Sequence, residues 1–129
     1  MRWPGATLSW QIWLMKRGEI WWVEFDPSVG SEIRKTRPAV IVSNDAANRN
    51  LALVVVVPLT SKIGRLYPGE AFVTLSGKPG KAMADQIMAA DKSRLKNLTD
   101  TLSKAEMTAL ETAILAGLGG NHGQEYAHT

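Results

Sequence analysis

The chain contains no cysteine and only two histidines. Disulfide bonds, a thiol nucleophile and a cysteine-ligated zinc site are therefore excluded. His122 and His128 both lie in a polar tail, so the core offers no histidine-based catalytic pair, and a histidine-ligated metal site is not expected. The sequence predicts a protein that works without a metal ion or any other cofactor.

Long hydrophobic runs are also missing. The most apolar stretch, residues 51–57, is too short and too rich in β-branched side chains to be a membrane-spanning helix. We therefore expect no association with a membrane and a location in the cytoplasm.

Neither sign of charge is in large excess. The 129 residues carry a net charge of +3, with 21% charged and 45% hydrophobic residues, which is ordinary for one soluble globular domain. The mild basic bias permits a polyanionic partner but does not require one.

The two ends of the chain differ in composition from the middle. Residues 1–15 are rich in tryptophan, make a poor signal peptide and are too short to span a bilayer, so we expect an N-terminal extension outside the fold. The alternative is that its tryptophans cover an exposed apolar patch. Residues 16–118 are expected to form one domain, and residues 119–129, which have little apolar content, a disordered tail.

The middle of the chain predicts a mostly β fold. Short runs of aromatic and β-branched residues predict strands at 19–25, 38–42, 51–57 and 70–75, with one or two more within 81–90. The strand at 51–57 is expected to stop at Pro58. Residues 45–49 are expected to form one helical turn, residues 76–80 a turn, and residues 91–101 an irregular segment.

A helix is predicted near the C-terminus. Ser103 and Glu106 fit a capping box, with Ser103 as the N-cap and Glu106 reaching back. An apolar stripe follows at helical spacing, formed by Met107, Leu110, Ile114 and Leu118. Together these elements predict a small, strongly bent antiparallel sheet or barrel closed by one C-terminal helix.

Residues 30–43 form a glycine-led basic loop that runs into an apolar strand. Pro38 fixes its own φ and disfavours helix at Arg37, so that arginine is expected at the mouth of a rigid strand, where it can meet an anion. A second polar group, Thr60, Ser61 and Lys62, follows the most apolar strand.

Four motifs in order carry a resemblance to a known family. GEIWWVEFDPSVGSE, TRPAVIVSND, VVVPLTS and DQIMAAD, followed by a closing helix, resemble the MazF/PemK/Kid toxins of bacterial toxin–antitoxin pairs over about residues 16–117. The resemblance implies an SH3-like barrel of the MazF/PemK/CcdB type, a homodimer, and metal-independent cleavage of single-stranded RNA at short sequences. It also implies a paired antitoxin. The family's catalytic arginine and threonine match Arg37 and Thr60.

The chemistry of RNA cleavage suits these residue types. The 2′-hydroxyl of RNA can attack the adjacent phosphorus, and the enzyme must then stabilise extra negative charge on the phosphoryl oxygens. An arginine offers a planar charged fork, and a threonine at a strand end can donate a hydrogen bond. Neither is an ordinary general base. Glu32 and Asp85 are the candidates for the base or for orienting the substrate, although Glu32 could instead hold Arg37 and Asp85 could cap a turn.

Further polar residues are candidates for contacting RNA. They are Ser31, Arg34, Lys35, Ser61, Lys62, Arg65 and Gln86. The chain departs from the family where Ser31 replaces a histidine of some relatives, and where Met83 and Met88 stand near Asp85 in place of arginine. Because those cations are missing, the resemblance does not extend to the cleavage rate or to the recognised sequence.

Partners and alternatives follow from the same motifs. The basic segments at 34–37 and 62–65 favour an acidic antitoxin peptide that orders on binding. Two tryptophans in the first strand and the apolar helix stripe favour a homodimer. A CcdB-like poison of DNA gyrase, or a degenerate toxin kept for antitoxin binding, is the alternative. The arginine–threonine pair favours the nuclease, because a gyrase binder needs no phosphate site.

Overall fold

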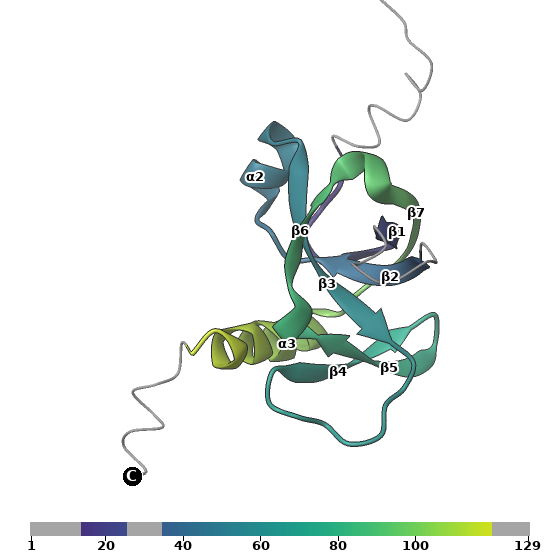
Figure 1. Cartoon of the computed structure of the whole chain (residues 1–129), viewed down its shortest axis with the longest axis vertical. Helices are drawn as coiled ribbons and strands as arrows, with labels where there is room; N and C mark the ends of the chain where they lie inside the picture. The colour runs from purple at the N-terminus through teal and green to yellow at the C-terminus, as the bar shows by residue number, and fades with distance from the viewer. Residues whose placement is uncertain (1–13, 26–34, 120–129) are drawn as a thin grey trace, which may run out of the picture.

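The computed structural model describes residues 14–25 and 35–119 of the chain (Figure 1). The tryptophan-rich segment, the basic loop before the second strand and the polar tail lie outside the described residues. Within the described part, no helix is both long enough and apolar enough to cross a membrane.

The described residues form a mostly β fold with one long helix at the C-terminal end, as predicted. The elements in order are β1 Glu19–Phe25, β2 Lys35–Ile41, α2 Asp45–Asn50, β3 Leu53–Thr60, β4 Glu70–Leu75, β5 Lys78–Met83, η1 Ala84–Gln86, β6 Met88–Asp91, η2 Lys92–Arg94, β7 Leu95–Thr101 and α3 Lys104–Gly117.

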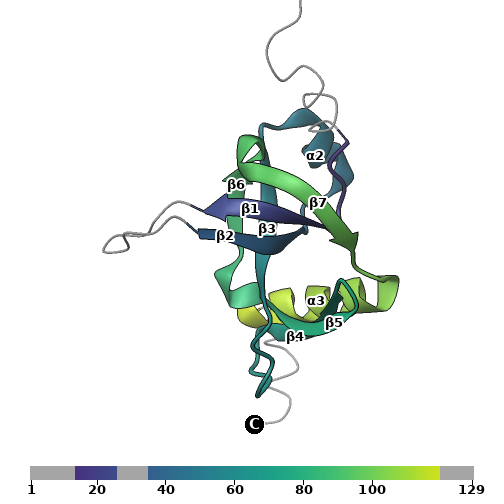
Figure 2. The same cartoon turned by 90° about the vertical axis from the view of Figure 1, so that its right-hand side faces the viewer.

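Strand β3 is the centre of the sheet. The strand order is β4-β5-β3-β2-β1-β7, and β6 also pairs with β3. The first half of β3 pairs with β6, as at Val54 and Ala90, while its end pairs with β5, as at Leu59 and Ala82. Because β3 passes from one part of the sheet to the other, the sheet bends around it. Figures 1 and 2 show α2 at one end of the molecule and β4, β5 and α3 at the other.

Both faces of the central strands are buried, which explains the continuous apolar run in β3. Neighbouring residues of a strand point to opposite faces, so Val56 and Val57 enter different cores. The core that contains Val57 is covered by α3, whose Leu110 is 0% exposed. The core that contains Val56 also contains Trp21 of β1.

Helix α3 begins with the predicted capping box. The Ser103 hydroxyl accepts the N–H of Glu106 at 3.1 Å, and the Glu106 carboxylate accepts the N–H of Ser103 at 2.9 Å. The same carboxylate accepts the N–H of Thr74 in β4 at 2.6 Å, so one side chain both caps the helix and ties it to the sheet. Burial raises the pKa of Glu106, but the N–H donors of Ser103 and Thr74 outweigh it and leave the pKa below its usual value.

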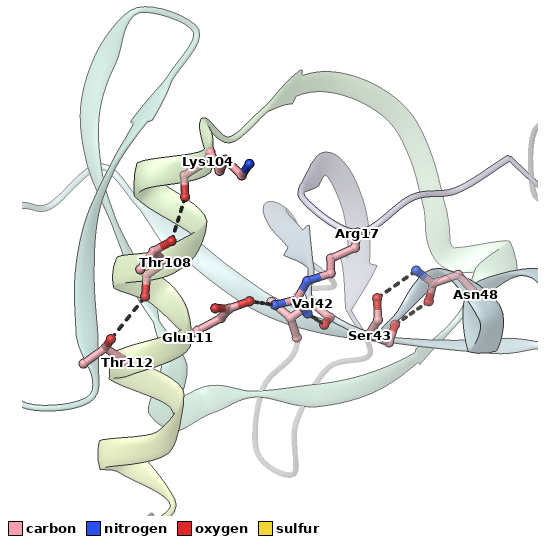
Figure 3. A network of polar contacts seen from close by, with 8 residues as sticks. All are labelled: Arg17, Val42, Ser43, Asn48, Lys104, Thr108, Glu111 and Thr112. Carbon is pink, nitrogen blue, oxygen red and sulfur yellow. Dashed lines mark hydrogen bonds and ion pairs between the residues drawn. The ribbon is translucent and has the colours of Figure 1, made fainter. Parts of the chain in front are cut away.

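A second group of polar contacts attaches α3 to the rest of the fold (Figure 3). The guanidinium of Arg17 donates to the carbonyl oxygen of Val42 and to the carboxylate of Glu111 in α3. Beside it, the side-chain amide of Asn48 in α2 donates to the carbonyl oxygen of Ser43 at 2.9 Å. These bonds join the start of the fold, the end of β2 and both helices.

The predicted end of the central strand is wrong. The strand predicted at 51–57 was expected to stop at Pro58, but β3 continues to Thr60. The ladder with β6 ends at Val56 and the ladder with β5 begins at Leu59, so Pro58 occupies the gap between them. Proline has no backbone N–H to donate to a neighbouring strand. Because neither β6 nor β5 pairs with Pro58, no hydrogen bond is lost there and the strand continues through it.

The prediction that residues 91–101 form an irregular segment is also wrong. It contains η2 and then the strand β7, which pairs with β1 through Trp21 and Leu98. Only Leu95 of β7 is buried, so the sequence shows no alternation of polar and apolar residues there. The hydrogen bonds of β1 make this segment a strand.

Smaller differences concern where elements begin and end. The strands predicted at 19–25 and 70–75 are confirmed, and α2 extends the predicted turn by one residue to Asn50. By contrast, β2 begins at Lys35 rather than at 38, and β5 begins at Lys78, inside the predicted turn. In both cases pairing with the preceding strand extends the strand toward the connection.

Two burial expectations are also wrong. Met15 was placed in the extension but is 2% exposed and packs in the core with Trp21, so the fold includes it. Leu118 was placed in the apolar stripe of the helix but is 69% exposed. It follows the last residue of α3, where the chain has left the helical spacing, and Ala113 takes the buried position beside Leu110 instead.

Candidate active site

Arg37 and Thr60 lie on two neighbouring strands of the sheet, β2 and β3. Arg37 is in β2, opposite Val23 of β1, and Thr60 is the last residue of β3. Ala39 of β2 is paired with Pro58 of β3. That pair is the last of the ladder between β2 and β3, and Arg37 and Thr60 each lie two residues beyond it on their own strands. Both side chains are partly buried.

Thr60 is held closely by its neighbours. It pairs with Lys81 of β5, and its hydroxyl oxygen accepts the N–H of Lys62 at 3.2 Å. A Cβ on Gly80 would lie only 2.9 Å from the carbonyl oxygen of Thr60, so β5 approaches this closely because residue 80 is glycine. The hydroxyl proton of Thr60 remains able to point to a phosphate oxygen.

Residues 61–69 form the loop after Thr60 and carry three of the predicted RNA-binding residues. Ser61, Lys62 and Arg65 are all exposed on it. The guanidinium of Arg65 lies 5.5 Å from the centroid of the Tyr67 ring, within the range of a cation–π contact. The loop therefore presents cations next to the strand edge that carries Thr60.

A buried ion pair at the base of this loop was missed by the sequence analysis. The ammonium of Lys81, which is 7% exposed, donates to the Glu70 carboxylate and to the Arg65 carbonyl oxygen, both at 2.9 Å. The bond from Lys81, together with the N–H of Tyr67, holds the pKa of Glu70 below its usual value. The available signal was a lysine in the middle of a strand whose other residues after Lys78 are small or apolar.

Asp85 and Gln86 lie on the other side of β3 from Arg37. They belong to η1, which connects β5 to β6 along the edge of β3 opposite to β2. Asp85 is exposed and close to Gly69 at the end of the loop. The side-chain amide of Gln86 contacts the Met83 sulfur at 3.4 Å. The structure therefore does not bring Asp85 and Gln86 together with Arg37 across the strand.

The remaining predicted site residues precede β2. Ser31, Glu32 and Arg34 lie outside the described residues, and Lys35 opens β2 opposite Phe25. In residues 14–25 and 35–119, no group of three or more histidine, cysteine, aspartate or glutamate side chains could hold a metal ion.

Comparison with known proteins points to one family. The PemK-like, MazF-like toxins of type II toxin–antitoxin systems match residues 16–118. Endoribonuclease MazF9 of Mycobacterium tuberculosis is 40% identical over 110 residues, which cover 78% of this chain and 93% of that protein. Endoribonuclease MazF of Staphylococcus saprophyticus is 32% identical over 111 residues, covering 82% and 92%.

Solved structures agree with this match. A mycobacterial endoribonuclease superposes with a TM-score of 0.68 at 30% identity and covers 81% of this chain and 90% of its own. A mycobacterial endoribonuclease in complex with its cognate antitoxin gives the same TM-score and identity, covering 81% and 94%. The SH3-like barrel type expected from the sequence is confirmed by these neighbours. The chain belongs to the PemK-like, MazF-like toxins of type II toxin–antitoxin systems.

Proposed function

We propose that this endoribonuclease toxin cleaves single-stranded RNA at short specific sequences, with the RNA's own 2′-hydroxyl as nucleophile and Arg37 and Thr60 as the catalytic pair. The observation that supports the pair is the pairing of β2 with β3, because Arg37 and Thr60 each lie two residues beyond its last pair, Ala39 and Pro58, on these neighbouring strands. Family membership supports the reaction, because the relatives are named endoribonucleases.

The proposed mechanism is a transesterification. The 2′-oxygen bonds to the adjacent phosphorus, the bond to the 5′-oxygen breaks, and the 2′-proton leaves to a base. The fork of Arg37 stabilises the charge that develops on the phosphoryl oxygens, and Thr60 donates a hydrogen bond to one of them. The products carry a 2′,3′-cyclic phosphate and a 5′-hydroxyl. Glu32 and Asp85 both stay candidates for the base or for orienting the substrate.

Further polar residues, named for their place in the sequence or the fold, are proposed to bind the RNA backbone. They are Ser31, Arg34 and Lys35 before Arg37, Ser61, Lys62 and Arg65 after Thr60, and Gln86 in η1. The four cations among them, Arg34, Lys35, Lys62 and Arg65, attract phosphates without selecting a sequence, because phosphate contacts position the strand and base contacts specify it.

The toxin is proposed to act in the cytoplasm as a homodimer silenced by a cognate antitoxin. A mycobacterial neighbour was solved with its antitoxin, which supports the same mode of control here. The two tryptophans of the first strand were both expected to add apolar surface for a dimer, but Trp21 is buried. Trp22, Leu115 and Leu118 are the exposed apolar side chains of β1 and the end of α3, at 38%, 51% and 69%.

Incubation of the purified protein with a long single-stranded RNA and EDTA tests the proposal. We expect Arg37→Ala and Thr60→Ala each to reduce cleavage about a hundred- to a thousandfold, the usual loss of one preorganised charge-stabilising group. Arg37→Lys should also be impaired, because a point charge does not reproduce the fork. Arg49→Ala and Thr112→Ala remove the same side chains from exposed helix positions and should leave the rate unchanged.

The chemistry of the ends completes the test. The fragments should carry a 2′,3′-cyclic phosphate, and a deoxynucleotide on the 5′ side of the scissile bond should abolish cutting. Efficient cutting of that substrate, or by Arg37→Ala, would contradict the mechanism. An absence of cutting together with inhibition of DNA gyrase would favour the CcdB-like alternative.

A further inference from the structure

Lys81 is one of two buried lysines in the described part of the chain, the other being Lys92, and it is the one that lies beside the candidate site. A buried charge costs free energy unless it is paired and hydrogen-bonded, and here two of its three donors are used, one on Glu70 and one on the Arg65 carbonyl. A buried ion pair is weak evidence for stability, because well-packed apolar side chains often serve as well. The position of its partners indicates a different role.

The partners of the Lys81 ammonium belong to the loop 61–69 or to Glu70, the residue that follows it. The Arg65 carbonyl lies in the middle of the loop, and Glu70 is the first residue of β4. The Glu70 carboxylate also accepts the N–H of Tyr67 at 2.9 Å, and the ammonium lies 5.8 Å from the Tyr67 ring centroid. One side chain therefore fixes the loop at two points.

Lys81 is also paired with Thr60, one of the two candidate catalytic residues. Lys81 is the ladder partner of Thr60, and the loop that it holds begins at Ser61 and carries the exposed side chains of Lys62 and Arg65. The backbone of Lys81 thus aligns Thr60, while its side chain aligns the cations that follow. An ordered loop binds a ligand more tightly than a loose one, because less conformational entropy is lost on binding.

We propose that Lys81 is a positioning residue for RNA: it holds the loop 61–69 beside Thr60, so that Lys62 and Arg65 meet phosphates next to the scissile bond. This inference rests on the proposed function, since it takes Thr60 to mark the cleavage site. Lys81 itself is too deeply buried to be the main contact with RNA. It acts through the loop.

The test compares Lys81→Met with Lys96→Met, which removes the same charge from an exposed position in β7. Steady-state cleavage of a short fluorescent RNA gives kcat and KM separately. For Lys81→Met we expect KM to rise about five- to tenfold, the size of two loosened exposed charge interactions, and kcat to stay within about threefold. The slope of log KM against log salt should fall by about 0.7 for each phosphate that the loop no longer neutralises. Lys96→Met should match the wild type.

Hydrogen exchange and a second variant separate positioning from simple destabilisation. In Lys81→Met, amide exchange should quicken in residues 61–69 and stay unchanged in the middle of β3. Glu70→Gln keeps the shape of the acceptor and should raise KM in the same direction by less, and it carries the test alone if Lys81→Met does not fold.

The outcomes are distinct. A rise in KM with faster loop exchange supports the inference. An unchanged KM, or a fall in kcat alone, overturns it while leaving the proposed function intact. A wild-type chain that cuts no RNA overturns the proposed function, and this inference with it.

Discussion

Replacing Gly80 with alanine tests how closely the fold holds Thr60 in place. A Cβ at this position would lie 2.9 Å from the Thr60 carbonyl oxygen, whereas ordinary contacts of a Cβ begin at 3.4 Å. The atom in the way belongs to the backbone and cannot rotate aside. One of the two strands, β3 or β5, must therefore move by about half an ångström, since backbone strain is the only other way to accept the methyl group.

This displacement sets the expected loss of activity. A misplacement of about 1 Å in a catalytic group costs roughly a hundredfold in rate, so half that shift at Thr60 should cost about tenfold. Overpacking of this kind also destabilises a fold by about 1–3 kcal/mol. The variant should remain folded and lose activity.

Single-turnover cleavage at saturating protein measures the effect without a contribution from RNA binding. The matched control is Gly117→Ala in α3, where the nearest backbone atom to a new Cβ is the Gly69 Cα at an ordinary 3.8 Å. This control should cut at the wild-type rate. If Gly80→Ala cuts RNA as fast as the wild type and melts at the same temperature, the close packing of β5 on Thr60 does not position it.

Two further predictions concern the attachment of α3. Leu110→Ala should lower the free energy of unfolding by about 2–5 kcal/mol, measured in urea, because this side chain is 0% exposed in the core; a smaller loss would mean that the core closes around the gap. The pKa of Glu106 is lowered in the folded state, so its carboxylate stabilises the fold above pH about 4.3, and this contribution disappears as the pH falls through the folded pKa. Glu106→Gln should therefore be less stable than the wild type near neutral pH, and that deficit should shrink in acid; a deficit that is independent of pH would contradict the assignment.

Some elements could be predicted because their signals are local. The capping box places Ser103 and Glu106 three residues apart, and β1 and β4 each alternate or concentrate apolar residues between turn signals. The carboxylate of Glu106 also binds the N–H of Thr74, and nothing in the sequence indicated that long-range contact.

Other elements depend on a partner strand and could not be predicted. The strand β7 has a polar sequence and exists because β1 supplies its hydrogen bonds. The extension of β3 through Pro58 depends on the gap between β6 and β5, whose position is set by the whole sheet. Local propensity gives the wrong answer in both places, since tertiary pairing outweighs it.

The candidate site divides in the same way. The motifs around Arg37 and Thr60 marked both residues from the sequence alone, as charge and hydroxyl groups at the ends of apolar strands. The structure adds that the two residues lie on paired strands, each two residues beyond the last pair of that ladder.

The sequence by itself determined that the protein is mostly β, has a capped C-terminal helix and lacks cysteine chemistry, because composition and short-range spacing decide these properties. Only the tertiary structure decided that Lys81 is buried and holds the loop after Thr60. Lys81 lies opposite Phe72 in the ladder of β4 and β5, so Glu70, two residues from Phe72, is its diagonal neighbour on one face. That contact joins residues 11 positions apart on two strands, and the register of those strands specifies it.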